Sequence, residues 1–335
     1  MHIPDAVIDP RVAAATGAIA AGALAYGLRT LRDRLRERTT VLMGSMAAFV
    51  FAAQMVTFPL LVIPGASGHL LGGVLAAVLL GPWAGAVVIA AVLVVQCFLF
   101  GDGGLTALGA NFVNMGLIGS VVGYAIYAPI RRAIGGRSGV LIGSMAAAWF
   151  SVILASGAFA VELAASGRWS KFPDILGWMA LVHAAIGMGE ALITGMVVRF
   201  LLLTRPDLLD DPEGADGSTA AHWGRVALAG LGISLAVVIF LSPIASESPD
   251  GLEYVGGEKV KFLPPEGSGP PPAFPAPIPD YRLPGLSRYR SAATAAAGVV
   301  GTVVVFGVGL VLARAFTPGK PGPGWGREGI AADAA

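Results

Sequence analysis

The most obvious shortage in this sequence is charge. Only 13% of the 335 residues are Asp, Glu, Lys or Arg, whereas 55% are hydrophobic and the mean hydropathy is +0.74. Soluble domains carry about a quarter charged residues, so this chain has too little polar surface to cover itself in water. The sequence therefore predicts an integral membrane protein.

Other absences exclude whole classes of function. The single cysteine, Cys97, lies inside an apolar run, which excludes a disulfide framework and a CxxC metal site. With 22 Lys and Arg against 21 Asp and Glu, the charge balance gives no reason to expect a nucleic-acid partner. There is no GxxxxGK[ST] sequence for ATP hydrolysis and no helical HExxH pair, because His183 and Glu190 are seven residues apart. The chain is therefore predicted not to be an enzyme.

Apolar runs predict an all-α membrane fold. A helix needs roughly 20 apolar residues to span the hydrocarbon region. Such runs lie at residues 12–28, 41–63, 83–100, 105–130, 138–165, 178–204, 226–244 and 292–313. Residues 69–80 are apolar but too short for a full span, and predict either a short tilted helix or a re-entrant one.

Basic residues predict the orientation, because short loops rich in Lys and Arg stay in the cytoplasm. The stretch RTLRDRLRERTT at 29–40 and the stretch RRAIGGR at 131–137 should both be inside. This places the N-terminus outside and the C-terminal tail in the cytoplasm of a multi-pass protein of the cell membrane. The start MHIPDAVIDP has no basic region before the first apolar run and does not read as a secretory signal peptide.

Two of the four histidines fall on the same side of the membrane in this topology. His2 precedes the first span, and His69 lies in the outer loop PGASGH after two crossings. The amine of Met1, the amide of His2 and an imidazole nitrogen of His2 form fused five- and six-membered chelate rings around a metal. An imidazole nitrogen of His69 completes four nitrogens. A flat nitrogen set suits Ni(II), Cu(II) or Co(II) better than zinc.

Further polar residues gather in the spans near the outer face. Asn111 and Asn114 are three residues apart, and His183 and Glu190 are two helical turns apart. Intramembrane polar groups usually face a cavity or a partner. We interpret these four as groups that orient the ligand imidazoles, with interhelical hydrogen bonding as the alternative.

The motifs resemble a known family. The sequences MHIPD, SGHLLGG at 67–73, LGANFVNMG at 108–116 and HAAIGMGEALIT at 183–194 resemble the CbiM/NikM proteins, substrate-specific (S) components of energy-coupling factor (ECF) transporters for cobalt and nickel. The resemblance implies a seven-helix S-component bundle, with metal ligands at Met1, His2 and His69. Ala6 departs from the glycine common in similar proteins, which affects the local turn and not the donors. Cobalt against nickel, as transported substrate, stays open.

The rest of the chain resembles the PDGLE-type small subunit (NikN/CbiN) through SPDGLEYV at 248–255. We therefore expect a metal-binding domain at 1–205, a cytoplasmic linker at 206–224 rich in Asp, Gly and Pro, and a domain at 225–335 with two transmembrane helices. The outer loop between these two helices has polyproline character and is expected to be partly disordered.

The resemblance also implies partners and a mechanism. An importer without its own ATPase needs an EcfT-like coupling subunit (CbiQ/NikQ) and an EcfA-like ATPase (CbiO/NikO), beside the membrane lipid. The small residues Gly44, Ala48 and Ala52 offer either a docking surface for such a partner or ordinary packing within the chain. The alternative function is a stand-alone secondary transporter or channel for divalent transition metals, which would need charged residues along a path through the mid-membrane.

Overall fold

The structure is a helical membrane fold. The computed structural model describes residues 2–32, 37–210, 220–265, 268, 271–286 and 288–315. Within these ranges, six helical stretches are long and apolar enough to cross a membrane. One of them, Gly136–Thr204, holds two helices that turn back at Ser166 and Gly167. The predicted class, an all-α integral membrane protein, is confirmed.

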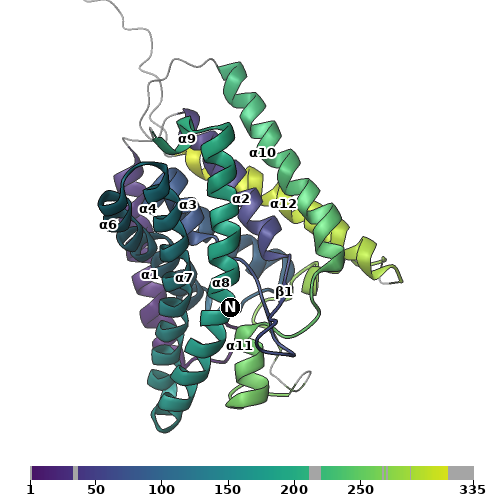
Figure 1. The fold of residues 1–335 in the computed structure, drawn as a ribbon. Helices are drawn as coiled ribbons and strands as arrows, with labels where there is room; N and C mark the ends of the chain where they lie inside the picture. Colours follow the sequence, from purple (N-terminus) through teal and green to yellow (C-terminus); the bar gives the residue numbers. More distant parts are fainter. Residues whose placement is uncertain are drawn as a thin grey trace, which may run out of the picture.

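The first half of the chain forms the bundle on the left of Figure 1. Its helices are α1 (Pro10–Arg32), α2 (Glu37–Gln54), α3 (Gly73–Leu80), α4 (Pro82–Val95), α5 (Leu108–Asn111), α6 (Gly123–Ile134), α7 (Gly136–Leu163) and α8 (Phe172–Thr204). Three π-helical stretches extend them: Gln96–Phe100 continues α4, Phe112–Val122 joins α5 to α6, and Ala164–Arg168 follows α7. The long helices α7 and α8 pack side by side.

The segment between α2 and α3 differs from the expected span. Residues 41–63 were predicted to be one helix, but α2 ends at Gln54. Beyond it, β1 (Phe58–Pro59) pairs antiparallel with β2 (Ser67–Gly68). Pro59 and Pro64 explain the early end, because proline in a helix interior removes a hydrogen bond and clashes with the preceding turn. The loop that carries His69 therefore begins inside the predicted span.

The short apolar segment 69–80 forms a helical hairpin. Helix α3 has eight residues, about 12 Å at 1.5 Å per residue, which is too short to cross the hydrocarbon region. It ends at Gly81, whose φ of 87° lies in the region that favours glycine, and Pro82 starts α4 at once. α3 and α4 then pack against each other in the centre of the bundle.

Helices α10 (Ala220–Leu241) and α12 (Arg290–Ala315) pack on α2 and on each other, away from α7 and α8 (Figure 1). Small residues allow this approach: the Cα of Gly44 lies 3.1 Å from where a Cβ on Gly309 would be. Ala48 and Ala52 on the same helix are fully buried. The small residues of α2 thus serve packing within the chain and not a free docking surface.

The segment between α10 and α12 contains short helical turns. These are Ser242–Ile244, α11 (Gly251–Glu253), Tyr254–Lys259 and Pro279–Tyr281. α11 lies apart from α10 and α12, against α8 (Figure 1). The linker predicted at 206–224 includes a short helix α9 (Asp207–Asp210); residues 211–219 and the tail after residue 315 lie outside the described residues.

Candidate metal centre

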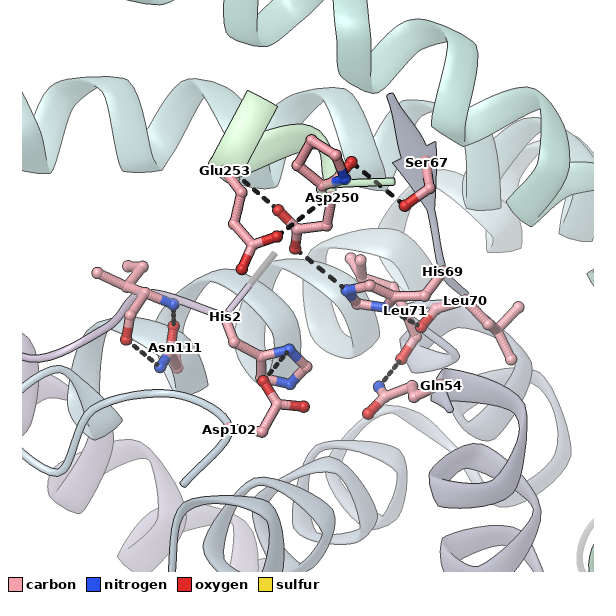
Figure 2. A network of polar contacts seen from close by, with 12 residues as sticks. His2, Gln54, Ser67, His69, Leu70, Leu71, Asp102, Asn111, Asp250 and Glu253 are labelled. Carbon is pink, nitrogen blue, oxygen red and sulfur yellow. Dashed lines mark hydrogen bonds and ion pairs between the residues drawn. The ribbon is translucent and has the colours of Figure 1, made fainter. Parts of the chain in front are cut away.

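His2 and His69 come together as the sequence predicts. Their rings stack with centroids 5.3 Å apart and planes inclined by 22°, and both side chains are buried (Figure 2). His2 belongs to the segment before α1, and His69 to the loop between β2 and α3. Met1, the third predicted ligand, lies outside the described residues.

Asn111 fixes the chain next to His2. Its side chain accepts a hydrogen bond from the amide of Ile3 (2.8 Å) and donates one to the carbonyl of Ile3 (3.2 Å). The amide of Gly104 also donates to that carbonyl (2.8 Å). Asn111 therefore holds the backbone and not, as predicted, an imidazole ring.

The turn that follows is tied down by Asp5. Its carboxylate accepts hydrogen bonds from the amide and hydroxyl of Thr106 and from the amide of Ala273. Burial favours the neutral acid, but these hydrogen bonds lower the pKa of Asp5. Ala6 has a φ of 62°, a left-handed conformation that favours glycine, which explains why glycine suits this position.

Glu190 supports the loop behind His69. Its carboxylate accepts hydrogen bonds from the amides of Leu71 and Gly72, the latter at 2.8 Å. The ring of His69 is held by its own backbone, with Nδ1 2.9 Å from the carbonyl oxygen of Leu70. Because that oxygen only accepts, Nδ1 carries the proton and Nε2 keeps its lone pair. Glu190 thus positions the backbone of the loop and makes no contact of its own with the imidazole.

Asn114 and His183 make other hydrogen bonds than the predicted ones to the imidazole rings of His2 and His69. Asn114 donates a hydrogen bond to Glu162 of α7 (2.9 Å). This is the interhelical hydrogen bonding expected from the sequence as the alternative role. His183 donates from Nδ1 to the carbonyl of Met179 one turn earlier (2.9 Å), and its buried Nε2 has no hydrogen-bond partner. His183 lines a small cavity with His69, but no hydrogen bond joins the two rings.

Sequence reasoning missed the polar residues that touch the two rings. Nε2 of His2 lies 3.0 Å from Oε1 of Gln96, and Nδ1 lies 3.2 Å from Oδ1 of Asp102. Nε2 of His69 lies 3.8 Å from Oδ2 of Asp250 (Figure 2). Gln96 is an uncharged residue in an apolar run. Asp250 lies in SPDGLEYV, the motif that resembles the PDGLE-type subunit, and that resemblance assigns Asp250 no role at the site.

The C-terminal half reaches the site through Asp250. Asp250 caps α11: its Oδ1 accepts from the amide of Glu253 (2.8 Å), and Glu253 accepts from the amide of Asp250 (3.0 Å). Ser67 donates to the carbonyl of Ser248 (2.7 Å), which fixes this segment to β2. Burial favours the protonated acid, but the positive charge of the chain's N-terminus and the hydrogen bond from the amide of Glu253 hold the pKa of Asp250 well below its usual value.

A second contact from the same half fixes Asp102. The hydroxyl of Tyr281 donates to Oδ2 of Asp102 (2.5 Å), and its ring stacks on Phe100 with centroids 4.5 Å apart. Burial lowers the pKa of His2 to about 4, although the Asp102 carboxylate acts in the opposite direction. The ring of His2 is therefore neutral near pH 7 and has a lone pair for a metal.

These groups line a cavity of about 470 Å³. Among the residues that the structure describes, no three His, Cys, Asp or Glu side chains lie close enough together to hold a metal ion.

Comparison with known protein families matches two profiles in succession. The CbiM profile, described as the cobalt uptake substrate-specific transmembrane region, covers residues 2–208. The PDGLE domain profile covers residues 224–317. This chain belongs to the CbiM family. In this member of the family, a PDGLE domain follows in the same chain.

Two relatives are named as fused proteins, and one solved structure matches the first part of the chain. The putative fused nickel transport protein NikMN of Archaeoglobus fulgidus is 36% identical over 317 residues, covering 94% of this chain and 98% of that protein. The fused nickel transport protein NikMN of Rhodobacter capsulatus is 35% identical, covering 66% and 67%. A crystal structure of a truncated transition metal transporter covers 61% of this chain and 99% of its own, with 30% identity and a TM-score of 0.55. The family and these relatives are transport proteins and not enzymes, and the relatives are named for nickel, cobalt or other metals.

Proposed function

We propose that the chain is the substrate-binding membrane component of an ECF-type importer and captures Ni(II) or Co(II) at the extracytoplasmic face. The ligands are the amine of Met1, the amide and imidazole nitrogens of His2, and the imidazole of His69. The observation that carries the proposal is the stacking of His2 on His69 at 5.3 Å, although 67 positions separate them in the sequence. Relatives named as nickel and cobalt transport proteins support the choice of metals.

The coordination chemistry follows from the donors. Amine, amide and imidazole nitrogens in one plane favour Ni(II) and Cu(II) over metals that prefer a tetrahedral set. In this proposal the chain carries no ATPase of its own, and an EcfT-like coupling subunit with EcfA-like ATPase subunits supplies the energy for release into the cytoplasm.

Metal binding by the purified full chain tests the proposal. We expect competition titrations to show tight binding of Ni(II) or Co(II), and His2→Ala and His69→Ala to weaken it at least tenfold. Glu162→Gln is the matched control, because Glu162 is a buried carboxyl group that accepts a hydrogen bond from Asn114 and is not among the proposed ligands. Equal affinity in His2→Ala and the wild type would contradict the site.

The contribution of the Met1 amine needs its own variant. A short peptide added before Met1 moves the amine away from His2, so we expect it to abolish tight binding while helical content stays unchanged. Cells that produce the chain together with a coupling subunit and ATPase subunits should accumulate the metal. Accumulation at the same rate by the chain alone would favour a self-sufficient transporter.

A further inference from the structure

Two glutamine side chains lie end to end behind the ring of His2. Both are buried within the bundle, Gln54 at the end of α2 and Gln96 just after α4. Nε2 of Gln54 donates to the carbonyl of Leu71 (2.9 Å), and Nε2 of Gln96 donates to Oε1 of Gln54 (2.8 Å). Oε1 of Gln96 then lies 3.0 Å from Nε2 of His2.

The carbonyl of Leu71 sets the direction of this chain of amides. A backbone carbonyl only accepts, so Gln54 must turn its NH₂ group toward Leu71 and its oxygen toward Gln96. Gln96 must in turn give its NH₂ group to Gln54 and present its oxygen to His2. A carbonyl oxygen pairs with a ring nitrogen only where that nitrogen carries a proton. The amides therefore favour a proton on Nε2 of His2.

This tautomer is the one that a chelate needs. A neutral imidazole has one proton, so a proton on Nε2 leaves the lone pair on Nδ1. Nδ1 is the nitrogen that closes a six-membered ring with the amide nitrogen of the same residue, whereas Nε2 points to the far side of the imidazole.

The surroundings of Nδ1 agree with this assignment. Nδ1 lies 3.2 Å from Oδ1 of Asp102, whose other oxygen is held by Tyr281. When Nε2 carries the proton, a lone pair and a carboxylate oxygen face each other across this gap, an arrangement that a cation stabilises. The opposite tautomer would bring Nε2 and Oε1 of Gln96 together as two acceptors, which is unfavourable in a buried place.

We propose that Gln54 and Gln96 are positioning residues that fix the metal-binding tautomer of His2. The inference rests on the metal site proposed above and adds its orienting groups. Histidine ligands commonly donate their second ring N–H to a carboxylate, carbonyl or water. Here the acceptor is an amide, which orients the ring without adding a buried negative charge that would need its own partner.

Two variants of similar size separate positioning from packing. Gln96→Leu fills the same space but removes the acceptor, and we expect the Ni(II) affinity of the full chain to fall about 10- to 100-fold, the usual effect of losing such a partner. Gln96→Glu keeps an acceptor oxygen toward His2, and in its protonated form an O–H donor toward Gln54. We expect it to keep most of the affinity.

If Gln96 contributes through packing alone, Gln96→Glu should bind Ni(II) more weakly than Gln96→Leu. The reason is that burying a carboxyl group disturbs the interior more than burying a leucine. Affinity of Gln96→Leu equal to the wild type, or of Gln96→Glu as low as Gln96→Leu, would therefore overturn the inference. Gln54→Leu provides a second variant outside direct contact with His2. This variant frees the amide of Gln96 to turn over, so we expect a smaller loss of Ni(II) affinity than in Gln96→Leu. An unchanged affinity would also contradict the proposal that the two amides fix the tautomer of His2.

A spectroscopic readout does not depend on affinity. Square-planar Ni(II) is diamagnetic, so the ring nitrogens of ¹⁵N-histidine can be observed by NMR in the loaded wild-type protein. We expect His2 to show a protonated Nε2 and a metal-bound Nδ1. The reverse assignment would disprove the proposed role of Gln54 and Gln96. If instead the wild type binds neither Ni(II) nor Co(II), or if His2→Ala binds the metal as tightly as the wild type, the proposed function itself fails. That result is distinct from a failure of the proposed role of Gln54 and Gln96.

Discussion

Glu190 acts on the loop that carries His69 through the backbone, because it holds the amides of Leu71 and Gly72. Glu190→Gln keeps one acceptor oxygen but turns an NH₂ group toward an amide that needs an acceptor. One buried N–H then loses its partner, which costs about 1 to 3 kcal/mol. We expect a lower unfolding temperature and weaker Ni(II) binding, measured by thermal denaturation and competition titration.

Glu162→Gln is the matched control for this prediction. Glu162 is a buried carboxyl group on α7 that accepts a hydrogen bond from Asn114 and makes none to the loop that carries His69. We expect it to affect stability only. Weaker metal binding in Glu162→Gln, or unchanged binding in Glu190→Gln, would contradict a specific role of Glu190 at the loop.

Ala6 offers a test of the turn after His2. A non-glycine residue in the left-handed conformation costs roughly 1 to 2 kcal/mol, and Ala6 has a φ of 62°. Ala6→Gly removes that cost, so we expect the free energy of unfolding to rise by about 1 kcal/mol. Ala15→Gly, at an exposed position inside α1, should lower it instead. Chemical denaturation measures both, and a destabilised Ala6→Gly would show that the turn is not strained.

At this scale the sequence predicts the meeting of the two histidines but not their environment. His2 and His69 follow from counting spans, because topology puts both on one face. Gln54 and Gln96 escape notice because each is a single amide within an apolar run. Asn111 and Glu190 are near the site as expected, yet they bind backbone groups, and no sequence pattern distinguishes a side chain that holds a ring from one that holds an amide.

At the scale of elements, α11 places Asp250 beside His69 because Gly251 allows close approach to α8. A Cβ at Gly251 would lie 2.5 Å from Cδ1 of Ile186 and 3.0 Å from Cε1 of His183. We expect Gly251→Ala to push α11 off α8 and to separate Asp250 from His69. Limited proteolysis between α10 and α12 should become faster while the helical bundle resists.

The matched control is Gly257→Ala in the next helical turn. A Cβ there meets nothing within 4 Å, so we expect cleavage at the wild-type rate. If Gly251→Ala is as resistant as Gly257→Ala, the close contact between α11 and α8 does not hold the segment in place.

Apolar periodicity predicts the long helices well, but it misplaces the ends of the elements around the site. The apolar run 41–63 continues past the true end of α2, since hydropathy does not register the prolines that allow β1 and β2 to form. The length of the apolar segment 69–80 correctly indicates that it is too short to span the membrane. Only the structure shows that this segment turns at Gly81 and forms a hairpin with α4. A sequence that is apolar on all sides of a helix does not indicate which neighbouring helix it packs against.

At the scale of the whole molecule, the two halves meet along α2. Separate chains of residues 1–210 and 220–335, produced together, should therefore associate through α2, α10 and α12 and copurify in detergent. Gly309→Leu should weaken this association, because Gly309 lies against Gly44. Gly307→Leu is the control, since a Cβ there meets nothing within 4 Å. Copurification with equal yield from both variants would contradict this interface.

The sequence predicts this organisation into two halves through resemblance more than through physics. Composition and apolar runs predict a helical membrane protein, and the motifs add the family. Neither predicts that the second half contributes to the proposed metal site, where Asp250 contacts His69 and Tyr281 contacts Asp102. These contacts join loops that are more than 170 residues apart in the sequence. Nothing in the local sequence of one loop indicates which other loop it contacts.

The placement of His2 also has a consequence for biosynthesis. The residues around it emerge from the ribosome in the order Gln54, Gln96, Asp102, Asn111 and Tyr281, each long after the histidine itself. Because the groups that hold and orient the ring come from so far downstream, the nascent N-terminus has no assembled cage while translation continues. The set of groups that orient the ring of His2 is therefore complete only when most of the polypeptide has been made and inserted.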